Sequence, residues 1–76
     1  MGLHEVIFYS SPDTPFTMAS AALGKVMSWD LARAYRFCKE AHENGTCLLC
    51  ICSKEQARKY VLDMEEHSLI GEQVPI

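Results

Sequence analysis

The segment from Thr46 to Cys52 constrains the fold of this chain more than any other stretch. It is short, it is apolar or thiol-bearing after its first residue, and Gly45 and Ser53 bound it. A run of this length with such flanks favours a central β-strand over a helix.

Two further segments have strand-like composition. Glu5–Tyr9 is β-branched and aromatic and shows no polar alternation after Glu5, so we expect a strand that is buried on both faces or nearly so. The tail, Ser68–Ile76, holds two apolar pairs around Gly71 and could carry a last short strand.

Helical spacing of apolar residues predicts three helices between and after these strands. They span Pro15 to Met27, Trp29 to about Asn44, and a third range that follows the capping-box pattern Ser53–Gln56 and ends near Glu66 or His67. Three helices on one face of a small sheet, in the order β-α-α-β-α with or without a final strand, make an α+β fold.

Short polar residues mark the expected helix ends. Thr14 before Pro15 is a candidate N-cap for the first helix, and Ser28 is a candidate N-cap for the second, with Asp30 in its first turn. Asn44-Gly45 supplies a left-handed stop for the second helix.

The totals limit the classes of function. A chain of 76 residues is a single domain, residues 1–76, whose ends, 1–4 and 71–76, are expected to be loosely ordered. The net charge of −3 and the scattered basic residues argue against a nucleic-acid partner. No apolar run reaches the ~18–20 residues that span a membrane, so no membrane partner is expected.

The four cysteines allow several interpretations. Cys38 lies in the second helical pattern, while Cys47, Cys50 and Cys52 share one strand, in which alternation places Cys47 opposite the other two. Disulfides are therefore not favoured. We interpret the thiols as buried and reduced, which suits the cytoplasm or a reducing organelle stroma.

Chemically active thiols are the alternative. Cys47-x-x-Cys50 has redox spacing but lies within a strand, away from a helix N-terminus. Cys38 and His42, one helical turn apart, could bind a metal with Cys50 and Cys52, although zinc motifs use tighter, loop-borne pairs. A Cys–His nucleophile pair lacks an identifiable third group. We therefore predict no catalytic residue, no metal and no cofactor.

The loop from Tyr9 to Phe16 is the strongest candidate site. It is polar and bracketed by prolines, a composition suited to contacting a partner. If the loop and the second helix share one side of the sheet, polar groups gather at the mouth of an apolar cavity, as in a ligand or peptide-end pocket. The polar residues are Ser10, Ser11, Asp13 and His42, beside Phe16, Ala19, Cys38 and Ala41.

From Val6 to Lys59 the chain resembles the ClpS adaptor family, small proteins that hand N-degron substrates to an AAA+ Clp protease. The resemblance rests on a shared register of short motifs. These are the strand that ends in a polar loop, Thr14-Pro15, Ser28-x-Asp30, Ala34, His42-x-x-Gly45, the apolar strand and Glu55.

The resemblance implies a non-enzymatic adaptor. It would bind the free N-terminus of peptide or protein substrates with a bulky apolar first residue, and dock on the N-domain of a Clp AAA+ chaperone. By position, the amino group would meet Ser10, Ser11, Thr14 and His42, the first side chain would meet Phe16, Ala19, Cys38 and Ala41, and the chaperone would meet Glu55.

One departure from the family pattern affects the amine contact. The family has an Asn-Asp pair where this chain has Ser10-Ser11, so Asp13 is the candidate to supply the missing carboxylate. A ClpS-fold interaction module that has lost N-degron binding is the alternative function, and a thiol or metal-binding protein is a third.

Overall fold

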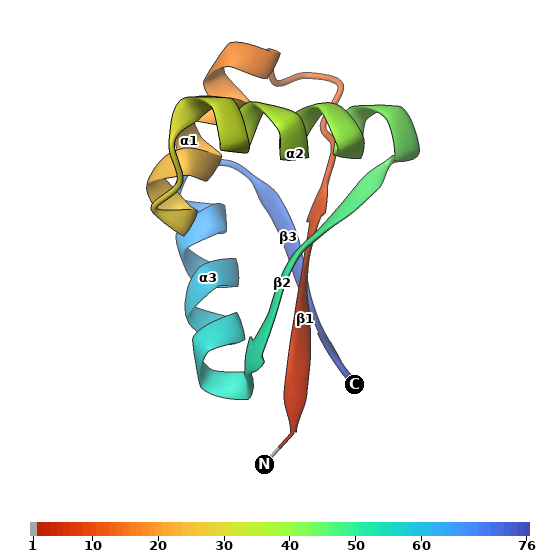
Figure 1. Ribbon diagram of the computed structural model, residues 1–76, viewed down its shortest axis with the longest axis vertical. Helices are drawn as coiled ribbons and strands as arrows, with labels where there is room; N and C mark the ends of the chain where they lie inside the picture. Colours follow the sequence, from red (N-terminus) through yellow and green to blue (C-terminus); the bar gives the residue numbers. More distant parts are fainter. Residues whose placement is uncertain (1) are drawn as a thin grey trace.

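A computed structural model describes residues 2–76, which form three helices and a three-stranded antiparallel sheet (Figure 1). The α+β class and the order of elements predicted from the sequence are confirmed, including the final strand. In chain order the elements are β1 (Leu3–Tyr9), α1 (Phe16–Met27), α2 (Leu31–Asn44), β2 (Thr46–Ser53), α3 (Lys54–Glu66) and β3 (Ile70–Pro75).

The sheet has the strand order β2-β1-β3, so β1 is the central strand. The expectation that the segment from Thr46 to Cys52 forms the central strand is therefore wrong. β2 lies at an edge, and α2 and α3 both contact it and cover its buried residues Cys47 and Leu49. The N-terminal strand instead pairs on both sides, with β2 and with β3.

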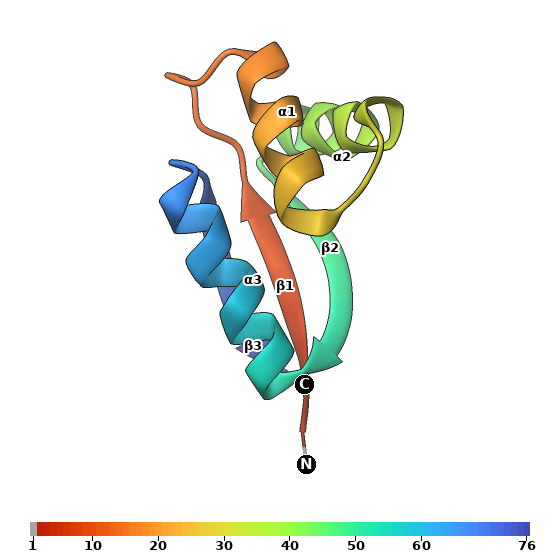
Figure 2. The same cartoon turned by 90° about the vertical axis from the view of Figure 1, so that its left-hand side faces the viewer.

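The helices cover one face of the sheet (Figures 1 and 2). α3 lies along the strands, whereas α1 and α2 pack on each other across one end of the molecule. The buried side chains between these layers form one core, which includes Val6, Phe8, Leu23, Ala34 and Met64. Within residues 2–76, no helix lies on the opposite face of the sheet.

Burial of β1 follows from this one-sided cover. His4, Val6 and Phe8 face the helices and are buried, whereas Ile7 and the other alternating residues keep part of their surface exposed. The prediction of a strand buried on both faces or nearly so holds for the inward face, whereas the outward residues are half-buried, apart from Leu3, which is exposed. Apolar residues occupy the outward positions although no element of the described chain covers them.

A β-bulge in β2 changes the side to which its cysteines point. The register shifts between Val6 and Ile7, so that Cys47, Cys50 and Cys52 pair with Phe8, Val6 and His4. Directly paired residues share a face of the sheet. All three thiols therefore face the helices, and the expected opposition of Cys47 to the other two is wrong. The four cysteines are free.

The connection between α1 and α2 differs from the predicted caps. Ser28 ends α1 in a left-handed conformation, with φ of 59°, and Asp30 caps α2 by accepting a hydrogen bond from the Arg33 amide at 2.8 Å. The first helix also lacks a side-chain cap, because Pro15 is extended and stands in the N-cap position predicted for Thr14.

Other predicted helix ends are confirmed. Gly45, with φ of 87°, terminates α2. The Ser53 hydroxyl accepts a hydrogen bond from the Gln56 amide at 3.2 Å and so caps α3.

The terminal segments expected to be loose mostly belong to the sheet. Residues 3–4 lie in β1 and residues 71–75 in β3, and the Ile76 amide donates to the Leu3 carbonyl at 3.0 Å. Met1 lies outside the described residues. Over residues 2–76, no helix combines the length and apolar character needed to cross a membrane.

Candidate functional site

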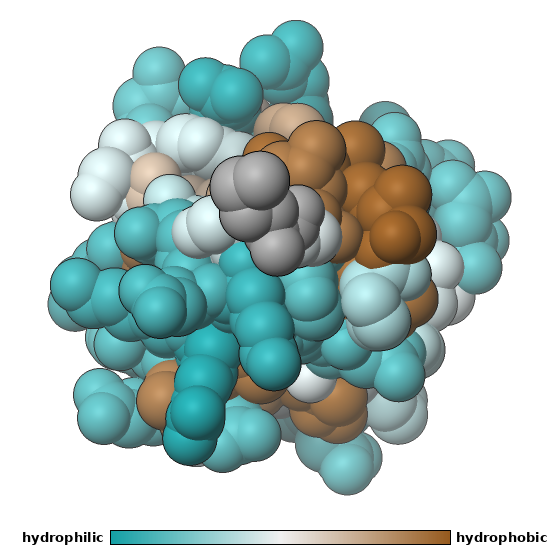
Figure 3. Space-filling view, turned by 90° about the horizontal axis from the view of Figure 1, so that it is seen from below, coloured by the Kyte–Doolittle hydropathy of each residue, from teal (hydrophilic) through white to brown (hydrophobic). Residues whose placement is uncertain are grey.

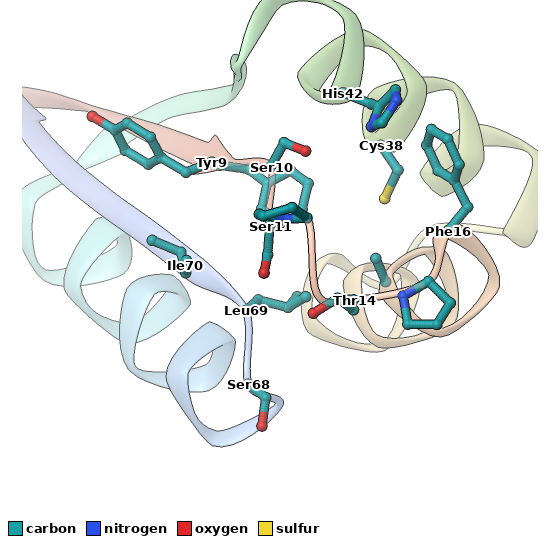
Figure 4. A pocket seen from close by; sticks show the side chains of 14 residues that line it. Tyr9, Ser10, Ser11, Thr14, Phe16, Cys38, His42, Ser68, Leu69 and Ile70 are labelled. Carbon is teal, nitrogen blue, oxygen red and sulfur yellow. The ribbon is translucent and has the colours of Figure 1, made fainter.

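A cavity of about 220 Å³ opens where the loop after β1 meets α1, α2 and the start of β3 (Figure 4). Most of the predicted site residues line it, namely Ser10, Ser11, Thr14, Phe16, Ala19, Cys38 and His42. The volume is below the ~300–1,000 Å³ of typical small-molecule sites, and it suits one amino-acid side chain rather than a large cofactor.

The loop between β1 and α1 is held at both of its ends. The Ser10 amide donates to the Gly45 carbonyl at 3.1 Å, which ties the loop to the junction of α2 and β2. The Thr14 amide donates to the Ser11 carbonyl at 3.3 Å and closes a turn. These backbone bonds fix the loop against the helix that carries His42.

One wall of the cavity is apolar. The Phe16 ring packs against the His42 ring, with 4.9 Å between centroids, and against the Tyr35 ring at 5.7 Å. The Cys38 thiol points into the space between Phe16 and Ser11 (Figure 4). Burial raises the pKa of this thiol, so the group remains neutral and contributes to an apolar wall.

The facing wall carries hydroxyl groups. Ser10, Ser11 and Thr14 are each partly buried, and the His42 imidazole lies across the cavity from them (Figure 4). None of the described residues that line the cavity is an Asp, Glu, Lys or Arg. The polar wall can therefore accept and donate hydrogen bonds but offers no carboxylate to a cation.

Three predicted residues lie outside the cavity lining. Asp13 is exposed and does not line the cavity, and Ala41 is fully buried behind it. Glu55 is exposed in the first turn of α3. The expected swing of Asp13 into the site is not present in this arrangement.

The sequence missed the contribution of the C-terminal segment. Ser68, Leu69 and Ile70 line the cavity from the turn after α3, together with Phe8 and Tyr9. Ile70 reaches the site because it pairs with Tyr9 across the sheet. The pairing of the third strand with β1 would have revealed these residues, but its register could not be deduced from the sequence.

Tyr9 marks the rim of the cavity toward the open side of the sheet. Its hydroxyl donates to the Glu72 carboxylate on β3, and this bond raises the pKa of the Tyr9 hydroxyl. The Glu72 carboxylate is thus already engaged.

The strand thiols are poorly suited to redox chemistry. Burial, together with a 2.9 Å hydrogen bond to the Glu40 carboxylate, raises the pKa of Cys47 to about 12. Burial and the neighbouring Cys52 thiol raise the pKa of Cys50. Reactive thiols require the opposite shift. Within residues 2–76, no group of three or more His, Cys, Asp or Glu residues is placed to hold a metal ion.

Comparison with known proteins identifies a solved structure with a similar fold. No family model matches the chain, and no curated protein is similar in sequence. Among solved structures, ClpS2 of Agrobacterium tumefaciens bound to L-phenylalaninamide superposes with a TM-score of 0.89 at 17% sequence identity, over 99% of this chain and 98% of ClpS2. At this identity the similarity is one of fold: the chain has a ClpS-like fold.

Proposed function

We propose that this chain is a substrate adaptor that binds a peptide N-terminus with a bulky apolar first residue and docks on a Clp AAA+ chaperone. The cavity carries the proposal. It combines an apolar wall from Phe16, Ala19 and Cys38 with a hydroxyl-bearing loop and His42, in a volume suited to one side chain. We infer a binding role rather than a catalytic one.

The ligand bound to ClpS2 supports a ligand of the same chemical class for this chain. L-phenylalaninamide, the ligand bound to ClpS2, has a free α-amino group and an aromatic side chain. In this chain the aromatic ring would enter beside Phe16 and Cys38, and the amino group would meet the loop hydroxyls and His42.

The amino group would be held by neutral acceptors. Ser10, Ser11 and Thr14 can each accept a hydrogen bond from an ammonium through a hydroxyl oxygen, and His42 can do so through an unprotonated ring nitrogen. Bonds of this kind are weaker than those with a carboxylate partner. We therefore expect micromolar affinity.

Fluorescence anisotropy tests the proposal directly. Labelled peptides that begin with Phe, Leu, Tyr or Trp are titrated with the full chain, and matched N-acetylated peptides serve as controls. Binding that N-acetylation abolishes is the expected result, and His42→Ala should weaken it. Equal binding of free and acetylated peptides, or none, would contradict the proposal.

Chaperone docking is assigned to the start of α3. Glu55 is exposed there and is free to meet a basic group of the chaperone. Pull-down of a Clp N-domain by the chain tests this step, with Glu55→Lys expected to abolish capture. Glu65→Lys, at another exposed acidic position of the same helix, is the matched control.

One observation favours the second candidate function, an interaction module without N-degron binding. The described residues that line the cavity include no carboxylate, and Asp13 is exposed outside that lining. Chaperone capture that depends on Glu55, together with absent peptide binding, would identify this module.

A further inference from the structure

The uncovered face of the sheet meets the candidate cavity at Tyr9 and Ile70, and its other residues have no part in the proposed function. Outward positions follow from the register, since directly paired residues share a face. Those of β1 are Leu3, Glu5, Ile7 and Tyr9. Their partners are Ser53, Ile51, Leu48 and Thr46 on β2, and Val74, Glu72 and Ile70 on β3. Ile76 joins them through its backbone bond to Leu3. We call this set the open face.

Aliphatic side chains dominate the open face. Leu3, Leu48, Ile51, Ile70 and Ile76 are each 43–72% exposed. The solvated side of an antiparallel sheet is normally polar, so that apolar and polar residues alternate along each strand. Figure 3 views the molecule from the end at which β1 begins and shows a cluster of apolar residues there, next to polar ones. Contiguous apolar patches of this kind mark interaction surfaces.

The charges of the open face are all of one sign. Glu5 lies between Ile51 and Val74, and Glu72 lies beside Ile7. Among the described residues of the face there is no Lys, Arg or His. Two copies packed face to face would bring carboxylates together, which disfavours self-association. A partner with basic residues beside an apolar stripe would be complementary in both respects.

We propose that the open face docks an amphipathic helix of another protein, with an aliphatic stripe flanked by Lys or Arg. Ile7 on the central strand, with Leu48 and Ile51 on the neighbouring edge strand β2, contacts the stripe, while Glu5 pairs with a flanking cation. This surface lies on the side of the sheet opposite α3, which carries Glu55. The contact is therefore additional to the proposed chaperone docking.

A synthetic leucine-lysine helix peptide is the probe. We expect its addition to the ¹⁵N-labelled full chain to shift amide resonances of β1, β2 and β3 at outward positions. Ile51→Lys should weaken binding about tenfold, because it places a cation in the apolar contact. Leu62→Lys, at an equally exposed position of α3, is the matched control and should leave the affinity unchanged.

A second variant tests the contribution of the Glu5 charge to binding without changing the size of the side chain. Glu5→Gln should lower the affinity at low salt and reduce its salt dependence, whereas Glu66→Gln on α3 should do neither. A leucine-glutamate helix peptide should not bind.

Three outcomes would overturn the proposal. They are no shifts on the open face with the leucine-lysine peptide, an affinity that Ile51→Lys leaves unchanged, and a stable dimer of the free chain that Ile51→Lys dissociates in sedimentation equilibrium. The last would assign the face to a second copy. Thermal unfolding of each variant confirms that it is folded.

Discussion

Ser11 is the residue at which the role of charge in the proposed amine binding can be tested. Its hydroxyl lines the polar wall, where no described residue supplies a carboxylate. Hydrogen bonds to charged groups contribute about 1.5–3 kcal/mol against about 1 kcal/mol for neutral ones. We expect Ser11→Asp to tighten binding of Phe-initiated peptides by about fivefold. Anisotropy measures this, with the uncharged Ser11→Asn as control. An equal gain with Asn would show that charge is not the cause.

Cys47 links stability to alkaline pH. Its pKa rises from 9.0 to about 12 on folding, because the thiol is buried and bonded to Glu40. A raised folded pKa means that this contribution to stability is complete below about pH 9 and is lost as the pH climbs toward 12. Thermal unfolding from about pH 8 to about pH 11 should show a falling midpoint. The fall should be shallower in Cys47→Ala. Identical slopes would exclude Cys47 as the source.

Individual site residues were partly accessible from the sequence. The loop, Phe16 and His42 were identified because each lies at a fixed offset within one element. Asp13 and Ala41 do not line the cavity, since the direction of a loop side chain and the depth of a helical one depend on packing. Leu69 and Ile70 were missed because their approach depends on pairing between strands far apart in sequence.

At the scale of elements, the α1–α2 connection offers a clear test of which residue caps α2. Asp30→Ala removes the bond to the Arg33 amide and should cost about 1 kcal/mol of unfolding free energy. Ser28→Gly relieves a left-handed conformation and should be neutral or stabilising by up to about 1 kcal/mol. Urea denaturation measures both. The reverse ranking would restore Ser28 as the cap.

Element type and order were predictable because periodicity and end signals are local. Helix α3 and its Ser53 cap, and the Gly45 stop of α2, illustrate this. The order of the strands, and the face of the sheet to which each side chain points, were not predictable, because the assembled sheet sets them. The apolar run of β1 predicts burial on both sides, yet the helices cover one, and the bulge in β2 reverses the alternation on which the cysteine argument depended.

The whole molecule has a narrow margin of stability. A domain of this size is stabilised by roughly 4–11 kcal/mol. Its sheet has only three strands, so each outer strand protects a full edge of β1. β3 also brings Ile70 to the cavity and, with Leu69 buried behind it, connects the sheet to the site. Fold and site thus depend on the same C-terminal segment.

Removal of residues 70–76 should therefore unfold the chain rather than merely impair binding. The truncation exposes the edge of β1 from His4 to Tyr9 and removes its ladder of hydrogen bonds to β3. We expect a collapsed amide spectrum and loss of the cooperative thermal transition. Removing Ile76 alone, which costs one backbone bond to Leu3, should keep the fold. A dispersed spectrum from the longer truncation would show that β1, β2 and the helices are sufficient.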